Sequence, residues 1–348
     1  MNTIILDNNN HWDSLLFINA NTLDKMAFSL SCHLSFLQRQ VESPKYFQFK
    51  VSKKSGGFRE INAPNAELKY LQRNLSWKFN KIYSSPDGVH GFVKGTFLET
   101  RHIVSNAKLH IGKKWVWNLD IESFFSSITT QMVINRLMEA PFNFDENKAK
   151  YISLLIIYKR QLPMGSPCSP VVSNLVCENM DAQINQWVAN QNKFQPEINL
   201  VYSRYADDIT FSTDLAISDE HKLEIYDILN QYGFEVNRKK ERIQSNKQSQ
   251  WVTGIKINEK PNVDRSYIRN IRAALHQIRA KGLQEAATNF FNLKELANTT
   301  EIDRFLRILQ GRISHVGFVK GKDDSAYLKY WRELGEVMAP IQKEPLIY

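Results

Sequence analysis

Two short runs rich in β-branched and aromatic residues flank a polar Ala-Asp-Asp sequence at residues 201–213. Such runs on either side of a short polar segment are typical of a strand–turn–strand hairpin. The pattern therefore predicts that Asp207 and Asp208 lie at the tip of a β-hairpin. Because aspartate is also a common turn residue, the pair has two interpretations: a solvated turn, or oxygen ligands for a divalent cation.

Apolar spacing along the rest of the chain predicts a mixture of helices and short strands. Residues 1–45 carry apolar positions at helical spacing, which predicts an N-terminal helical extension. The other expected elements are a hairpin at residues 46–61, a helix at 65–83, a strand at Trp115–Asp120 followed by a helix, a helix from Ser169 (N-cap) and Pro170 to about Ala189, strand-like segments at 233–243 and 251–257, and a helix at 267–281.

The strand predicted at Trp115–Asp120 is apolar and ends in an acid. A carboxylate at the end of a buried strand is costly unless it is paired or bound to a metal. Asp120 is therefore the natural third carboxylate beside Asp207 and Asp208. Three acids on two adjacent strands can hold two Mg²⁺ ions, which together clamp the attacking and leaving oxygens of a phosphoryl transfer.

Basic residues are concentrated in two of the predicted elements. The helix at 267–281 contains no acid and carries Arg269, Arg272, His276 and Arg279 on one face, beside an apolar stripe. It is either an ordinary surface helix or one that follows a phosphate backbone, and the missing acids favour the second. Lys53, Lys54 and Arg59 crowd the hairpin at 46–61, either as a solvated edge or as a grip for a triphosphate.

Composition agrees with a polyanionic partner and an intracellular setting. The 348 residues include 45 Lys plus Arg against 36 Asp plus Glu, a net charge of +9. The three cysteines, Cys32, Cys168 and Cys177, show no CxxC spacing and are interpreted as reduced thiols. The first residues lack a signal-peptide pattern, and the most apolar run is too short to span a bilayer. We therefore expect a cytoplasmic protein without a membrane partner.

An ordered set of short motifs resembles the reverse transcriptases and, within them, the bacterial retron type. The resemblance covers about residues 46–320. The matching segments are the YxDD box at Tyr205–Asp208, an acidic block at Asn118–Asp120, an LPQGxxxSP-like loop at 162–170, a GxxxNxxK stretch from Gly233 to Lys240, an NAxxH element from Asn106 to His110, and a VTG triplet from Val252 to Gly254.

The resemblance implies specific roles for individual residues. Asp120, Asp207 and Asp208 would be the catalytic acids and would bind two Mg²⁺ ions. The residues implied in nucleotide binding are Lys53 and Arg59 on the triphosphate, Phe125 as a steric gate against the ribose 2′-hydroxyl, Met164 in place of the family's usual glutamine, and Lys240 as a proton donor to pyrophosphate. Nucleic acid would be bound by Asn106, His110, Arg269, Arg272 and Arg279. Met164 cannot form the hydrogen bonds of a glutamine amide.

The resemblance also implies a fold and partners. We expect an α+β right-hand polymerase with an N-terminal extension (1–45), fingers (46–112), a palm (113–260, with part of the fingers around 145–165) and a helical thumb and C-terminal region (261–348). It would copy part of its cognate non-coding RNA into single-stranded DNA from dNTPs, primed by an RNA 2′-hydroxyl, to give msDNA. A separate effector protein in an antiviral (anti-phage) defence system would be a further partner. The alternatives are another defence-associated or intron-derived reverse transcriptase, or a non-catalytic RNA-binding scaffold.

Overall fold

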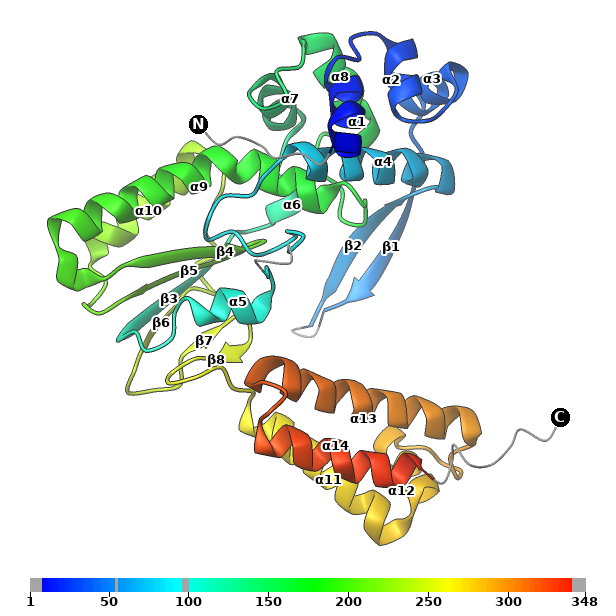
Figure 1. The fold of residues 1–348 in the computed structure, drawn as a ribbon, viewed down its shortest axis with the longest axis vertical. Helices are drawn as coiled ribbons and strands as arrows, with labels where there is room; N and C mark the ends of the chain where they lie inside the picture. The colour runs from blue at the N-terminus through cyan, green and yellow to red at the C-terminus, as the bar shows by residue number, and fades with distance from the viewer. Residues whose placement is uncertain (1–7, 54–55, 96–99, 340–348) are drawn as a thin grey trace. The chain divides into compact units, whose positions relative to one another are not determined.

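The computed structural model describes residues 8–53, 56–95 and 100–339 (Figure 1). The chain forms two compact units. The first comprises Met1–His102 and Trp117–Ile243, and the second comprises Ile103–Val116 and Gln244–Tyr348. Among the described residues, none of the helices is long and apolar enough to cross a membrane.

The first unit contains a β-hairpin, a sheet and the helices that pack on them. Its helices are α1 (Asn8–Ile18), α2 (Leu23–Ser29), α3 (Leu34–Glu42), α4 (Ala66–Ile82), α6 (Phe124–Ser127), α7 (Thr130–Met138), α8 (Glu146–Ile156), α9 (Ser169–Phe194), the 3-10 turn η1 (Pro196–Ile198) and α10 (Asp219–Gln231). Its hairpin is β1 (Tyr46–Ser52) with β2 (Phe58–Pro64). The sheet has the order β4-β5-β3-β6, from β4 (Val201–Tyr205), β5 (Asp208–Thr213), β3 (Trp115–Asp120) and β6 (Arg242–Ser245).

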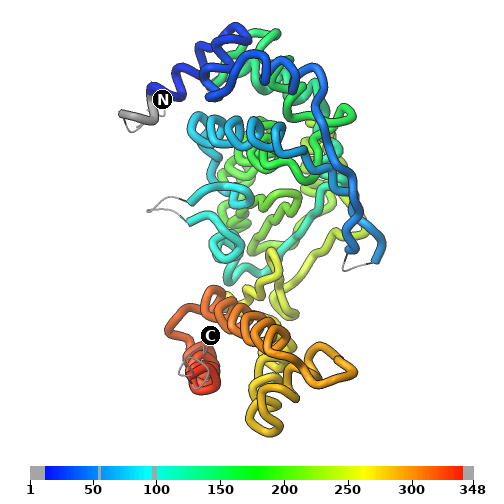
Figure 2. Tube along the Cα trace, turned by 90° about the vertical axis from the view of Figure 1, so that its right-hand side faces the viewer, coloured from blue at the N-terminus to red at the C-terminus, as the bar shows by residue number. Residues whose placement is uncertain are grey.

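The second unit is mostly helical. It contains α5 (Ile103–Lys108), the short strands β7 (Trp251–Val252) and β8 (Ile255–Lys256), and α11 (Arg265–Lys281), α12 (Leu283–Phe291), α13 (Thr299–Lys320) and α14 (Ser325–Met338). In Figure 2 the last four helices run from yellow to red along the chain. The apolar stripe of α11 is buried at Ile271, Leu275 and Ile278, as its spacing predicts.

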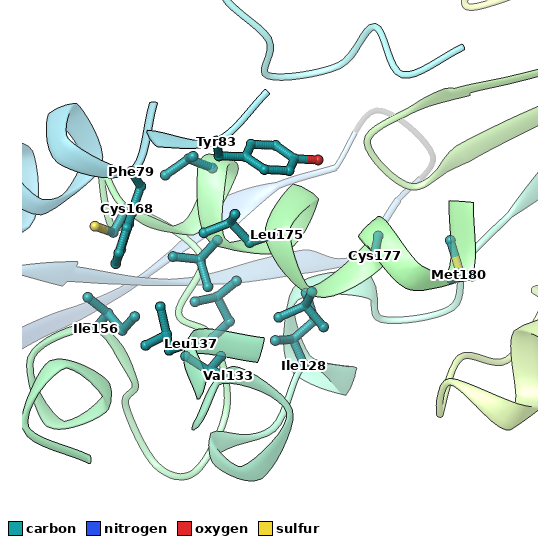
Figure 3. Close-up of a cluster of buried hydrophobic side chains, with 14 of the residues drawn as sticks. Phe79, Tyr83, Ile128, Val133, Leu137, Ile156, Cys168, Leu175, Cys177 and Met180 are labelled. Carbon is teal, nitrogen blue, oxygen red and sulfur yellow. The ribbon is translucent and has the colours of Figure 1, made fainter. Parts of the chain in front are cut away.

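A core of apolar side chains joins the helices of the first unit. Figure 3 shows one cluster that contains Phe79 from α4, Tyr83 directly after α4, Val133 and Leu137 from α7, Ile156 from α8 and Leu175 from α9. The N-terminal helices are attached to this core by the buried Lys148, whose ammonium donates to the carbonyls of Phe17 and Ile18. Burial lowers the pKa of Lys148 to about 8.

The predicted secondary structure is confirmed for most elements and wrong in three places. The hairpins at 46–61 and 201–213, the strand Trp115–Asp120 and the helices of the N-terminal extension are present. However, α9 has Cys168 as its N-cap and continues to Phe194. Ser169 is not the cap, because it is already the first residue of the helix. Its hydroxyl donates to the carbonyl of Pro163 instead.

The other two errors concern segments predicted as strands. Residues 233–241 are irregular apart from an isolated bridge of Val236 to Ile121, and only β6 follows them. Gly233, with φ 77°, closes the end of α10 and turns the chain. The segment 251–257 is a tight hairpin, because Thr253 (φ 47°) and Gly254 (φ 78°) are both left-handed and reverse the chain between β7 and β8.

Candidate active site

Two strand ends bring the three predicted acids into one region of the first unit. Tyr205 pairs with Asp208 across the β4–β5 hairpin, so Ala206 and Asp207 form its turn. Ala206 adopts a left-handed φ of 60°, which lets the chain reverse within two residues. The amide of Ile121, directly after β3, donates to the carbonyl of Asp207 at 3.0 Å. The end of β3, and with it Asp120, is therefore attached to the hairpin turn.

The acids repel one another, and nearby cations partly offset this repulsion. Loss of solvent, followed by the nearby carboxylates of Asp207 and Asp120, raises the pKa of Asp208 to about 6. Desolvation and Asp120 also raise the pKa of Asp207. Lys240 lowers both pKa values, together with Arg59 at Asp207 and Arg242 at Asp208. Nothing in the sequence around Arg242 marks it as part of this site.

The ammonium group of Lys240 is hydrogen-bonded to the carboxylate oxygens of Asp120 that a metal ion would use. Lys240 Nζ is 2.7 and 2.9 Å from the two carboxylate oxygens of Asp120. In the part of the chain that the structure describes, no three His, Cys, Asp or Glu side chains are arranged to hold one metal ion. Mg²⁺ in polymerases nevertheless needs only one or two carboxylates besides water and substrate phosphates. The carboxylates of Asp120, Asp207 and Asp208, whose mutual repulsion the nearby cations only partly offset, therefore fit a divalent ion.

A buried ion pair is hydrogen-bonded to the backbone of the turn that carries the acids. Arg204 and Asp181 are fully buried, and the guanidinium donates to both carboxylate oxygens, at 2.8 Å from Nε and 2.6 Å from Nη2. Tyr202 donates to the same carboxylate at 2.6 Å. The remaining nitrogen, Nη1, donates to the carbonyl of Ala206 and to Asn174, both at 3.1 Å. The network thus connects α9 to the backbone of the turn that carries the acids.

A glycine-rich loop lies against the other side of the same turn. The amide of His90 donates to the carbonyl of Arg204 at 2.9 Å, so the loop runs beside β4. At Gly91, a Cβ atom would lie 2.3 Å from the amide nitrogen of Ala206. Asn174 donates to the carbonyl of Gly91 at 2.8 Å. Nothing in the sequence of residues 88–95 beyond its glycines indicates that this loop contacts the turn with the acids.

We expect Asp181→Asn to destabilise the first unit strongly. The substitution keeps the shape of the side chain but leaves the buried Arg204 without its counter-charge. Breaking a buried ion pair in this way costs about 3–5 kcal/mol. Urea denaturation of the purified variant measures the loss. Asp219→Asn is the control, because Asp219 is 91% exposed in its pair with Lys222, and such a surface pair contributes about 0–1 kcal/mol. Equal stability of the two variants would contradict a structural role for the buried pair.

The nucleotide-binding residues predicted from the sequence do not all lie together. Arg59 on β2 is close enough to Asp207 to lower its pKa. Met164 lies next to the same hairpin, since its carbonyl accepts from the amide of Asn62 at 2.7 Å. Lys53 is exposed at the end of β1, where its amide donates to Gly57, and Lys54 lies outside the described residues. The nucleotide-binding roles of these residues stay predictions.

The aromatic residue predicted as a steric gate has a partner that the sequence did not reveal. Phe125, in α6, is half-buried, and its ring centroid lies 6.0 Å from that of Phe92 and 5.4 Å from that of Phe124. Phe92 has a left-handed φ of 61° and follows directly after Gly91. The loop that contacts the acid-bearing turn therefore also contacts the predicted gate.

The predicted nucleic-acid-binding residues lie in the second unit, in two settings. Asn106 and His110 are buried at 1% and 0% exposure, and α5 packs on the β7–β8 hairpin, where Thr253 donates to the carbonyl of Ile103 at 3.1 Å. The NAxxH and VTG elements thus form one substructure. The basic residues of α11 are exposed, and one of them, Arg279, is paired with Glu333 at 2.7 Å. Their binding roles stay predictions.

Comparison with known proteins identifies the family. Residues 51–257 match the family model described as "Reverse transcriptase (RNA-dependent DNA polymerase)". The chain is 31% identical over 242 residues to the retron Ec86 reverse transcriptase of Escherichia coli, covering 67% of this chain and 70% of that protein. It is 31% identical over 265 residues to the retron Mx65 reverse transcriptase of Myxococcus xanthus, covering 70% of this chain and 58% of that protein.

The chain is also similar to a solved structure of telomerase from Candida albicans in complex with a TWJ fragment of telomeric RNA. The TM-score is 0.47 and the sequence identity is 12%, and the match covers 87% of this chain and 64% of that chain. The family match extends over more than half of the chain, and a relative at 31% identity is covered over more than two thirds of its length. The chain therefore belongs to the reverse transcriptases, and within them to the bacterial retron type. Its fold is the α+β right-hand polymerase fold of that family, whose members use divalent metal ions.

Proposed function

We propose that this protein is the RNA-directed DNA polymerase of a retron and that Asp120, Asp207 and Asp208 form its catalytic centre. The observation that carries the proposal is the attachment of two strand ends through the Ile121–Asp207 hydrogen bond, which gathers three carboxylates beside the cations of Arg59, Lys240 and Arg242. A cluster of this charge pattern suits a polyanionic, metal-bound substrate such as a dNTP.

In the proposed mechanism the protein mainly positions and neutralises its substrates. Two Mg²⁺ ions, when bound by the three aspartates, would activate the attacking hydroxyl and stabilise the leaving pyrophosphate. Arg59 would hold the triphosphate by its phosphate oxygens. Lys240, freed from Asp120 when metal binds there, would neutralise or protonate the pyrophosphate. Arg204 and Gly91 would keep the turn, and with it two of the carboxylates, in a fixed position.

The membership in the retron type supports further parts of the proposal. The template would be a cognate structured non-coding RNA, and synthesis would begin at an RNA 2′-hydroxyl to give single-stranded DNA joined to RNA. The exposed basic face of α11, at Arg269 and Arg272, would contact the nucleic-acid backbone. A separate effector protein would act with the complex in anti-phage defence. Because the RNA and dNTPs are cytoplasmic, the proposal places the protein in the cytoplasm. The predicted division into extension, fingers, palm and thumb belongs to the same proposal.

The direct test is to analyse the nucleic acid that purifies with the protein from its native locus. We expect a short single-stranded DNA whose mobility changes after treatment with a debranching enzyme, because a 2′-linkage joins it to RNA. DNA without such a branch would indicate another kind of bacterial reverse transcriptase. RNA without any DNA, from a protein that also fails to extend a primer on an RNA template, would refute polymerase function and favour an RNA-binding scaffold.

Phe125→Ala is expected to let the enzyme incorporate ribonucleotides. Removing the ring would open the space that a ribose 2′-hydroxyl occupies, and loss of the contact with Phe92 would widen it further. We expect the preference for dNTPs over rNTPs, measured as the ratio of the two kcat/KM values, to fall by about tenfold to a hundredfold, which corresponds to about 1–3 kcal/mol of discrimination. Phe194→Ala, at an 84% exposed position, is the control. An unchanged ratio in Phe125→Ala would refute the gate.

A further inference from the structure

The carboxylate of Glu241, directly after Lys240, accepts hydrogen bonds from two buried aromatic side chains. The indole nitrogen of Trp117 donates to Glu241 Oε1 at 2.8 Å, and the hydroxyl of Tyr226 donates to the same oxygen at 2.5 Å. The guanidinium of Arg238 lies 3.5 Å from Glu241 Oε2 and stacks over the ring of Tyr226. Glu241 is thus held by three partners, two on one oxygen and one on the other.

Glu241 and Lys240 contact opposite faces of strand β3. Trp117 and Asp120 are three residues apart on this strand, and successive side chains of a strand alternate between its two faces. Glu241 bonds to Trp117 on the face that packs against α10, where the rings of Trp117 and Tyr226 lie 5.9 Å apart. Lys240 bonds to Asp120, at the cluster of acids. Two neighbouring residues therefore bind β3 from both sides.

The backbone that carries Lys240 is also attached to the end of β3 on its other side. The amide of Asn237 donates to the carbonyl of Asp120 at 2.8 Å, and the amide of Lys240 donates to the carbonyl of Asn237 at 2.9 Å. Residues 238–240 form an exposed turn. This turn therefore lies between two attachments, the amide of Asn237 before it and the carboxylate of Glu241 after it.

We propose that Glu241 is a positioning residue of the polymerase reaction, which holds the turn at 238–240 so that Lys240 stays beside Asp120. The side chain of Lys240 is 57% exposed, so it has room to rotate. With the backbone fixed on both sides, its exchange from Asp120 to the pyrophosphate needs only that rotation. Groups held in place before a reaction lose less entropy when it occurs. The proposal rests on the function proposed above, because Glu241 acts only through Lys240.

Single-turnover primer extension on an RNA template tests this role in the full-length protein. We expect Glu241→Ala to lower the maximal rate by about tenfold to a hundredfold, as a displacement of about 1 Å would, with the apparent affinity for dNTP nearly unchanged. Glu241→Gln should restore most of the rate, because both aromatic donors bond to one oxygen, and an amide oxygen can accept both bonds. Equal losses in the two variants, or a loss of affinity alone, would refute positioning.

Helix α10 supplies a matched control. Glu224 also accepts from an indole nitrogen, that of Trp187, at 2.6 Å, but this bond joins α10 to α9 and not to β3. Glu224→Ala should therefore extend the primer at the wild-type rate. A loss as large as that in Glu241→Ala would show that the packing of α10, and not the position of Lys240, sets the rate.

A double-mutant cycle shows whether Glu241 acts through Lys240. Lys240→Ala alone should lower the rate by about a hundredfold. Adding Glu241→Ala to it should change the rate little, because the effects of residues that act as a unit do not add. Losses that add in full would overturn the proposal, and so would a wild-type rate in Lys240→Ala.

Acetylation of lysine amines with acetic anhydride, measured by mass spectrometry, gives a readout that does not depend on activity. The exposed neighbour Lys239 is the internal reference. In EDTA, we expect the labelling of Lys240 relative to Lys239 to rise in Glu241→Ala, because its ammonium is released from Asp120, and to stay at the wild-type value in Glu241→Gln. An unchanged ratio in Glu241→Ala would show that the pairing of β6 with β3 holds Lys240 without Glu241.

The outcomes separate this proposal from the polymerase function. If the wild-type protein extends a primer on an RNA template and Glu241→Ala does so at the same rate, Glu241 is not a positioning residue and the polymerase proposal stands. If the wild-type protein extends no primer at all, the polymerase proposal fails, and the role of Glu241 in the reaction fails with it.

Discussion

Asp207→Asn is expected to abolish DNA synthesis while RNA binding remains. Asparagine keeps the shape of the side chain, and the turn keeps its hydrogen bond, because Ile121 donates to the backbone carbonyl of residue 207. What disappears is one charge of the proposed metal site. Ionic stabilisation of a phosphoryl transfer by metal is worth several kcal/mol, so we expect a loss of about three orders of magnitude or more in the rate. Single-turnover primer extension measures this rate, and filter binding measures the affinity for RNA.

Stability measurements show whether that loss comes from chemistry or from unfolding. The pKa of Asp207 is raised because the carboxylate is desolvated and lies near Asp120, so a neutral residue removes a charge that the fold opposes. In EDTA, Asp207→Asn should unfold at the same temperature as the wild-type protein or higher. Added Mg²⁺ should raise the unfolding temperature of the wild-type protein and of Asp219→Asn more than that of Asp207→Asn. Full activity in Asp207→Asn would refute the metal assignment.

The sequence was most informative where structure is local. The alternation around Asp207 and Asp208 and the apolar strand before Asp120 specify a hairpin and a strand end from neighbouring residues alone, and both are present. The helix at 267–281 is present for the same reason, because the spacing of its basic and apolar residues depends only on its own sequence.

What the sequence did not reveal depends on contacts between distant segments. Arg204 lies in the middle of a predicted strand, and nothing near it indicates that its partner is Asp181, 23 residues earlier on a helix. The sequence of the NAxxH element likewise does not show that packing of α5 on the β7–β8 hairpin buries Asn106 and His110. Gly91 shows no pattern beyond a glycine-rich loop, because its importance comes from the backbone that lies against it.

Gly91→Ala is accordingly expected to damage activity although the residue bears no functional group. The φ of Gly91 lies outside the left-handed range, so the effect of alanine is steric. Its Cβ would lie 2.3 Å from the nitrogen of Ala206 and 2.8 Å from the carbonyl carbon of Tyr205. Both are backbone atoms, and no rotamer change can relieve the clash. Since the loop is also held by Asn174 and by pairing with β4, the turn carrying Asp207 and Asp208 must shift.

A displacement of about 1 Å in a catalytic group can cost about a hundredfold in rate, so we expect kcat to fall by roughly that factor. Overpacking should also cost about 1–3 kcal/mol of stability, which urea denaturation measures. The control is Gly335→Ala, at a helical position with nothing within 4 Å of the added Cβ, where alanine should be neutral or stabilising. Wild-type kcat in Gly91→Ala would show that the loop yields instead, and that the acid-bearing turn does not depend on this contact.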